Sequence, residues 1–360
     1  MALWLLNYIS IPIWNFLVKN KKLFIFIVSI QMLLLWAFFE ETLRVDYSNY
    51  LGYYTEVSTY GFGEMLSKID IFGFPAVDVN VRCENGWMII NWIVAKIGVG
   101  FDLFLLLHSI FCVIALGMFV YKYSDKPWLT YALFIALGFY KFSFGILRQI
   151  MTMCLFMYAI PFIKEKKVGK FLAIIFINFM IHRGSIVYVV LYFISKIKIN
   201  RKIFAGYYVL SLMCLLSSPF LVKGVITPLL EIMNYAYYIP EAWTMNNQVI
   251  LVFVLPVMLF VTIDFEEFFE NEIYNIFCWG FLLTLPIQVF STINGVFGRL
   301  AYYYYLFIIM LLPADLVHYK NEKIAALGVI AVYVMCGLFY AYSMLGTSYV
   351  PYTSIFALGI

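Results

Sequence analysis

Charged residues are scarce in this chain: they make up 12% of its 360 residues, whereas soluble domains average about 25%. Hydrophobic residues account for 64% of the sequence, and the mean hydropathy is +0.92. The longest polar insert runs from Glu40 to Glu84, and no stretch suggests a soluble domain of its own. The composition excludes an ordinary soluble enzyme. It predicts an all-α polytopic membrane protein, organised as a single integral membrane domain over residues 1–360.

Patterns typical of metal sites and disulfide frameworks are also lacking. Six cysteines are present, but all except Cys83 lie in apolar runs and none are spaced as Cys-x-x-Cys. The sequence contains no Asp-x-Asp pair on the predicted outer side and no cluster with the spacing of metal ligands. We therefore expect no metal site, no cofactor and an activity that does not depend on a metal.

The apolar runs predict about 12 membrane-embedded helices. A helix that crosses the hydrocarbon core needs about 20 residues, with a range of roughly 17 to 25. The first run precedes its lysines and lacks a small-residue cleavage site, so we interpret it as a retained helix. The runs 86–97 and 225–239 are shorter or more polar and are expected to be interfacial or re-entrant. The expected helices cover residues 3–18, 23–39, 101–121, 128–142, 147–163, 171–181, 185–194, 203–217, 249–263, 274–290, 299–312 and 324–343.

Lysine-rich connections set the predicted orientation, because the positive-inside rule places them in the cytoplasm. Residues 40–84 carry three basic and eight acidic side chains, a formal charge of 3 − 8 = −5. We therefore expect an external acidic loop at 40–85 and an external C-terminal segment at 344–360. The loop Asp264–Glu272 would be cytoplasmic although it has no lysine; acidic residues contribute little to orientation. The basic connections are Lys19–Lys22, Lys122–Lys126, Lys164–Lys170, Lys196–Lys202 and Lys320–Lys323.

Three rare ionisable residues, Arg148, His182 and Arg299, are expected at the tips of apolar hairpins. Charge at membrane depth is costly, so such residues mark a candidate functional site. The lysine clusters that flank His182 are separated by only 25 residues, and two helices of about 12 residues would each rise only about 18 Å. We therefore expect a short or re-entrant hairpin around His182, with one long crossing over 171–195 as the rival. The three residues are then predicted to meet in one outward-facing cavity.

Several short motifs recur in an order that resembles a known family. The segments are RVDYSNYLGYY at 44–54, ENGWMIINWI at 84–93, LRQ at 147–149, HRGS at 182–185, GR at 298–299 and VPY at 350–352. In order, spacing and position relative to the helices, they resemble the EpsG-type branch of the Wzy polysaccharide polymerases. The resemblance extends over almost the whole chain.

This resemblance implies a membrane enzyme that joins oligosaccharide repeat units carried on a polyprenyl diphosphate. The growing glycan would pass from its lipid to the next lipid-linked unit, at the outer face of the cytoplasmic (inner) membrane. Arginine suits a diphosphate leaving group because its planar fork of donors stays charged when buried, and the attacking hydroxyl needs a base or a positioning acceptor. The expected catalytic residues are Arg148, His182, Arg299, Glu84 and Asp46, and the expected substrate-binding residues are Arg44, Gln149, Arg183 and Tyr352.

Each of these residues also has a structural interpretation. The two arginines at the tips could snorkel to the interface. His182 could cap a helix or bond a backbone carbonyl, and Glu84 could cap the helix that follows it. The segment that contains Tyr352 could be a lid or an interfacial anchor. His108 lies in an apolar run and is expected to be a core histidine.

Three other functions compete with polymerisation. They are a ligase of the O-antigen type, a membrane acyltransferase built around His182, and a flippase for lipid-linked oligosaccharides. A flippase should carry deep basic residues on both sides of the membrane, whereas here they are expected on one side. The expected partners are the polyprenyl-diphosphate-linked oligosaccharide and the lipid bilayer, with a chain-length regulator as the candidate protein partner and no nucleic acid.

Overall fold

The computed structural model describes residues 1–40, 43–70, 74–75, 83–221, 224, 227–228, 247–292 and 295–354. Within these ranges the chain is helical, and its one β contact is an isolated bridge between Phe39 and Ser354. The chain divides into two compact units, which we describe separately. Unit 1 comprises Met1–Ile186 and Ile330–Ile360, and unit 2 comprises Val187–Val329.

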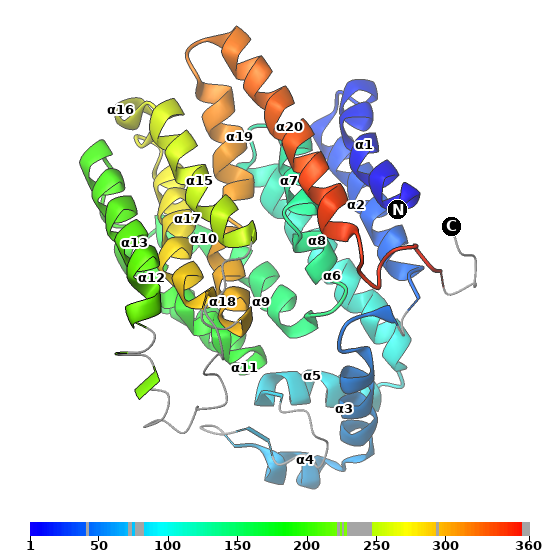
Figure 1. Ribbon diagram of the computed structural model, residues 1–360. Coiled ribbons are helices and arrows are strands. Elements are labelled where there is room, and N and C mark those ends of the chain that lie inside the picture. The colour runs from blue at the N-terminus through cyan, green and yellow to red at the C-terminus, as the bar shows by residue number, and fades with distance from the viewer. Residues whose placement is uncertain are drawn as a thin grey trace. The chain divides into compact units, whose positions relative to one another are not determined.

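Unit 1 contains long apolar helices and a group of short helices from the predicted external loop and from the run 86–97 that follows it. Figure 1 shows the short helices α3, α4 and α5 grouped at one end of the unit, away from α1 and α7. Close contacts join α2 to α6, α6 to α9, α3 to α5, and α11 to both α5 and α9. The helices are α1 (Ala2–Leu17), α2 (Lys21–Ala37), α3 (Tyr47–Thr59), α4 (Phe62–Lys68), α5 (Asn85–Lys96), α6 (Phe101–Tyr123), α7 (Pro127–Ala136), α8 (Phe139–Phe142), α9 (Leu147–Met157), α10 (Ile160–Lys164) and α11 (Val168–Ile181), with most of α20 (Glu322–Met344).

Unit 2 is built around α17 (Glu272–Ser291), which contacts the other long helices of this unit and is buried along most of its length. A Cβ atom at Gly280 would collide with the ring of Phe307, the residue directly before α19. Glycine therefore allows α17 to pack closely against the start of α19. The other helices are α12 (Tyr188–Ile194), α13 (Arg201–Leu221), α15 (Asn247–Thr262), α16 (Phe265–Phe268), α18 (Gly295–Tyr305) and α19 (Ile308–His318).

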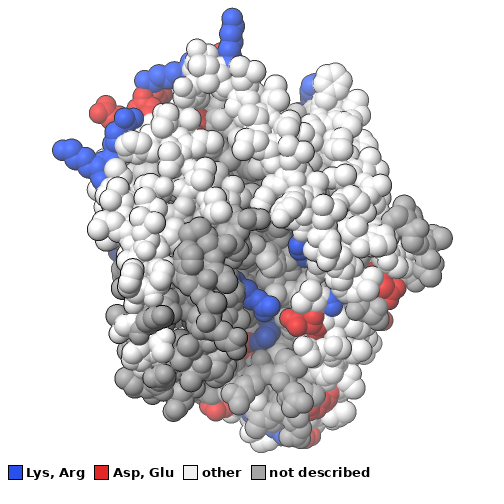
Figure 2. Space-filling view, viewed as in Figure 1, with Lys and Arg blue, Asp and Glu red and all other residues white. Residues whose placement is uncertain are grey.

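The helices fit a membrane protein. Among the described residues, four are long and apolar enough to cross a membrane: α6, α13, α17 and α20. The bent pair Gly298–Tyr305 and Ile308–His318, with a 40° bend, makes a fifth if it counts as one span. Several shorter apolar helices accompany them. Most of the described surface on the face shown in Figure 2 is uncharged.

Most expected helices appear within a few residues of their predicted bounds, but three expectations need correction. The run 128–142 is split, because Gly138 takes a left-handed conformation (φ +89°) between α7 and α8. The run 147–163 is split after Met157. The turn expected over 291–299 is too long, since α18 begins at Gly295 and Arg299 lies inside that helix, not at a hairpin tip. The run 225–239 lies almost entirely outside the described residues.

Candidate active site

The first feature of the site is the close packing of α5 on α11. A Cβ atom at Gly86 would lie 2.6 Å from the carbonyl oxygen of Met180 and 2.7 Å from its carbonyl carbon. Because these are backbone atoms of a helix, they cannot move aside cheaply, and only glycine permits the approach. The contact brings Glu84, at the N-terminus of α5, next to the end of α11.

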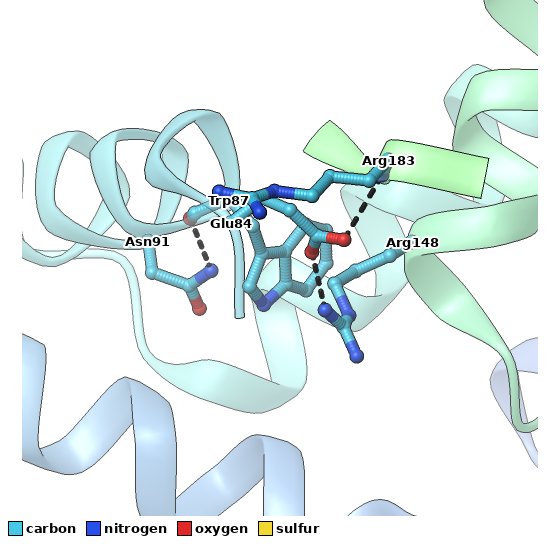
Figure 3. A network of polar contacts seen from close by, with 5 residues as sticks. All are labelled: Glu84, Trp87, Asn91, Arg148 and Arg183. Atoms are coloured by element: carbon cyan, nitrogen blue, oxygen red, sulfur yellow. Dashed lines mark hydrogen bonds and ion pairs between the residues drawn. The ribbon is translucent and has the colours of Figure 1, made fainter. Parts of the chain in front are cut away.

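Glu84 joins three segments that are far apart in the sequence (Figure 3). Its Oε2 pairs with Nη1 of Arg148 at the start of α9, and its Oε1 accepts a hydrogen bond of 3.0 Å from the backbone N–H of Arg183. The Glu84 residue is 6% exposed. A carboxylate buried to this degree is stable only when it is paired and hydrogen-bonded, and both of its oxygens are engaged here.

Glu84 occupies the N-cap position of α5, as one interpretation of the sequence expected, but its side chain makes no capping hydrogen bond to that helix. Its carboxylate contacts Arg148 and the backbone N–H of Arg183.

Aromatic side chains surround the Arg148 guanidinium. The Tyr50 ring lies 5.9 Å from it, and the Tyr50 hydroxyl is within hydrogen-bonding reach. Burial raises the pKa of Tyr50, and the charge of Arg148 opposes this shift. The phenol is therefore neutral at neutral pH. Trp87 packs edge-on against Tyr50 with the ring centres 5.7 Å apart, which closes the apolar side of the site.

His108 holds the backbone directly before the same arginine. Its Nε2 lies 3.0 Å from the carbonyl oxygen of Leu147, the residue directly before Arg148. Because a carbonyl can only accept, Nε2 carries the proton in this hydrogen bond. His108 is 4% exposed, which confirms the expectation of a core histidine and adds a role in fixing the first turn of α9.

His182 lies where α11 ends. Its backbone is extended and its N–H donates to the carbonyl of Asn178 at 2.8 Å, so a break at the predicted place is present. A short 3-10 helix, Arg183–Val187, follows. The Arg183 guanidinium stacks on the Phe74 ring, 4.1 Å from its centre. Whether the segment forms a re-entrant hairpin stays a prediction.

Asp46 precedes α3 in a left-handed conformation, with φ at +63°. Aspartate tolerates this region better than most residues, at a cost of about 1 kcal/mol or more. Its Oδ1 accepts from the Asn49 amide at 3.4 Å, and its charge influences the buried Tyr50 hydroxyl. Asp46 therefore lies near Arg148, because it precedes by four residues Tyr50, whose ring contacts this arginine.

Two residues expected to bind substrate have structural contacts instead. Nη2 of Arg44, which is 7% exposed, donates to the carbonyl of Trp36 at 2.7 Å in the last turn of α2. The hydroxyl of Tyr352 donates to the carbonyl of Leu35 at 3.0 Å, and Tyr352 is 3% exposed. These contacts tie the loop after α2 and the C-terminal segment to the end of α2. Roles of Arg44 and Tyr352 toward substrate stay predictions.

The remaining two expected residues are Gln149 and Arg299. Gln149 is buried on α9, and its carbonyl accepts from the Thr152 hydroxyl at 2.8 Å. Arg299 belongs to unit 2 and is exposed on α18. Since the two units are described separately, the predicted meeting of Arg299 with Arg148 and His182 stays a prediction.

Tyr50, Trp87 and His108 were not expected to belong to the site. One sequence signal could have found Trp87, because residues 84, 87, 88 and 91 recur at helical spacing and share one face of α5. All four are buried. In the part of the chain that the structure describes, no group of three or more histidine, cysteine or acidic residues could hold a metal ion.

Comparison with known families supports the assignment suggested by the motifs. A model of the EpsG family matches residues 23–354, nearly the whole chain. The chain belongs to the EpsG family. This is a family of the Wzy-like polymerase type, which the resemblance had indicated. No curated protein and no solved structure matches the chain significantly.

Proposed function

We propose that this EpsG-family protein is a polysaccharide polymerase. It transfers a growing glycan from polyprenyl diphosphate onto a lipid-linked repeat unit at the outer face of the cytoplasmic membrane, with about 12 membrane-embedded segments. One observation carries the proposal: the Glu84 carboxylate holds Arg148 and the His182–Arg183 segment together in a protein of this family. Two arginines beside one buried carboxylate leave a net positive charge, which suits an anionic diphosphate.

The proposed reaction is a substitution at the anomeric carbon of the donor. A hydroxyl of the acceptor sugar forms the new carbon–oxygen bond, and the bond between the anomeric carbon and the diphosphate oxygen breaks. The electron pair leaves with the lipid diphosphate, and the hydroxyl proton passes to a base. The protein must therefore stabilise charge on the leaving oxygens and accept one proton.

Arg148 is the proposed diphosphate ligand. A guanidinium has five N–H donors, more than one carboxylate uses. Glu84 and Tyr50 fix its orientation, so little reorganisation is needed when charge develops on the diphosphate. Arg183 is the second proposed ligand, and Arg299 stays a proposed ligand as the sequence suggested. Glu84 is a positioning residue, because both of its oxygens are engaged.

His182 and Asp46 remain the candidate bases. An imidazole is a base only when neutral, so a rate that depends on His182 should fall toward acidic pH. In His182→Gln this acidic limb should be lost and the remaining rate should be lower by about 10² to 10⁴-fold. The measurement is the pH profile of polymer formation by both proteins. An unchanged profile would remove His182 as the base and leave Asp46.

The decisive assay combines purified protein with lipid-linked repeat units and resolves the products by size. A polymerase makes a ladder of products. A flippase makes none, and neither does a ligase that is given no separate acceptor.

We expect the ladder to persist in EDTA, because no proposed step requires a metal. Loss of the ladder in EDTA and its return with magnesium or manganese would contradict this expectation. A separate experiment tests the topology by labelling single cysteines placed at positions 148 and 299. Both should react with a reagent supplied from the same compartment.

A further inference from the structure

An apolar groove runs between α2 and α6 on the surface of unit 1. Its volume is about 470 Å³, and its walls include Ile25, Phe26, Ile30, Leu33, Ile114 and Met118. Phe26 and Met118 are 61% and 54% exposed. Between the apolar residues lies Ser29, whose hydroxyl pairs with the Tyr131 hydroxyl at 3.1 Å. The groove therefore suits a hydrocarbon chain and offers little to a polar ligand.

One end of the groove is basic. Lys22 lines it, and the Nζ atoms of Lys21 and Lys22 each lie 5.6 Å from the centre of the Tyr121 ring. Nζ of Lys21 also donates to the carbonyl of Ser124 at 2.9 Å. One carboxylate, Asp125, acts on Lys21. The end of the groove thus carries a positive charge beside a purely apolar channel.

The length of the groove matches one leaflet of a bilayer. Lys22 and Leu33 lie at its two ends along α2, and the eleven helical steps from one to the other rise about 17 Å. Half of the hydrocarbon core is about 15 Å thick. The groove therefore reaches from the interface, where the lysines lie, to the middle of the membrane.

We propose that the α2–α6 groove binds one anionic phospholipid from the leaflet on the lysine side. One acyl chain lies between Ile30 and Ile114, and the phosphate lies at the amines of Lys21 and Lys22. Charge complementarity selects an anionic headgroup, since each lysine near a membrane surface favours one. Neither Glu84 nor Arg148 lines the groove.

The test uses native mass spectrometry of the purified full-length protein. Dioleoyl phosphatidylglycerol should remain bound as one adduct, and dioleoyl phosphatidylcholine, with the same chains, should bind about 30-fold more weakly. Lys21→Gln with Lys22→Gln should weaken phosphatidylglycerol binding by a similar factor, and the control Lys19→Gln should not. Equal binding of the two lipids, or full binding to the double variant, would overturn the proposal.

A second pair of variants tests the channel. Ile30→Trp fills the groove and should abolish the adduct, whereas Leu34→Trp adds the same ring to an exposed position of α2 outside the lining residues. Both variants should keep the wild-type melting temperature within a few degrees. An adduct that survives Ile30→Trp would refute the acyl-chain site. Binding of inorganic phosphate alone, or a dimer that forms through this face in place of the lipid adduct, would refute it as well.

Discussion

Arg148→Ala should abolish the product ladder in the reconstituted assay. The loss of a preorganised donor that faces developing charge costs about 10² to 10³ in rate, and Arg148 would supply several such donors. Arg148→Lys keeps the charge but loses the planar fork, so it should recover only part of the rate. The matched control is Arg201→Ala, an exposed arginine that stacks on Phe260 and Phe265 in unit 2.

A folding defect must be separated from a catalytic one in this experiment. Removing Arg148 leaves the buried Glu84 charge unpaired, which is expected to cost about 3 to 5 kcal/mol of stability. The double variant Arg148→Ala, Glu84→Gln removes the stranded charge and should restore much of the stability, as thermal unfolding would show. It should not restore the ladder. A ladder made by either variant at the wild-type rate would discard Arg148 as the diphosphate ligand.

Gly86→Ala should disrupt the site without touching a charged residue. The added methyl group collides with the Met180 backbone, at 2.6 Å from the carbonyl oxygen, so α5 must move away from α11. Overpacking of this kind costs about 1 to 3 kcal/mol. Movement of α5 also withdraws the Glu84 carboxylate from the Arg183 N–H, and the orientation of Arg148 is lost with it. We expect a lower melting temperature together with a strongly reduced ladder.

Gly52→Ala is the control for this variant, because a Cβ atom there meets nothing within 4 Å and the position lies inside α3. Alanine in a helix interior is more favourable than glycine by roughly 0.5 to 1 kcal/mol, so this variant should be as stable as the wild type or more so. If Gly86→Ala unfolds at the wild-type temperature and retains its rate, the packing of α5 on α11 is not what positions Glu84.

The helices could be predicted from the sequence because apolar length is a strong signal. The bounds of α6, α17 and α20 differ from the expected ones by only one or two residues at most ends. The breaks at Gly138 and after Met157 were not predicted, because the runs on both sides of them are equally apolar. Hydropathy records burial, whereas a break depends on backbone conformation and on which neighbouring helix the chain packs against.

The charged residues of the candidate site were predictable, whereas its aromatic members, His108 and the contacts were not. Arg148 was expected because charge is conspicuous in apolar surroundings, and Glu84 and Arg183 were expected from the motifs that contain them. Their pairing depends on the approach of α5 to α11, which no local pattern reports. The use of both Glu84 oxygens likewise depends on the tertiary structure, and it is the reason that we propose a positioning role for this residue. The orientation of Arg299 toward this site depends on how the two units associate.

The C-terminal segment has a consequence for how the protein is made. Its backbone accepts from the Trp4 indole at Tyr349 and from the Glu40 amide at Thr353, so residues near the two ends of the chain hold each other. Unit 1 is therefore discontinuous, and its last part is synthesised only after all of Val187–Val329. The early helices therefore stay incompletely packed until Ile330 and the residues that follow it in unit 1 have been synthesised. Truncated products would thus lack a closed first unit and should be open to membrane proteases.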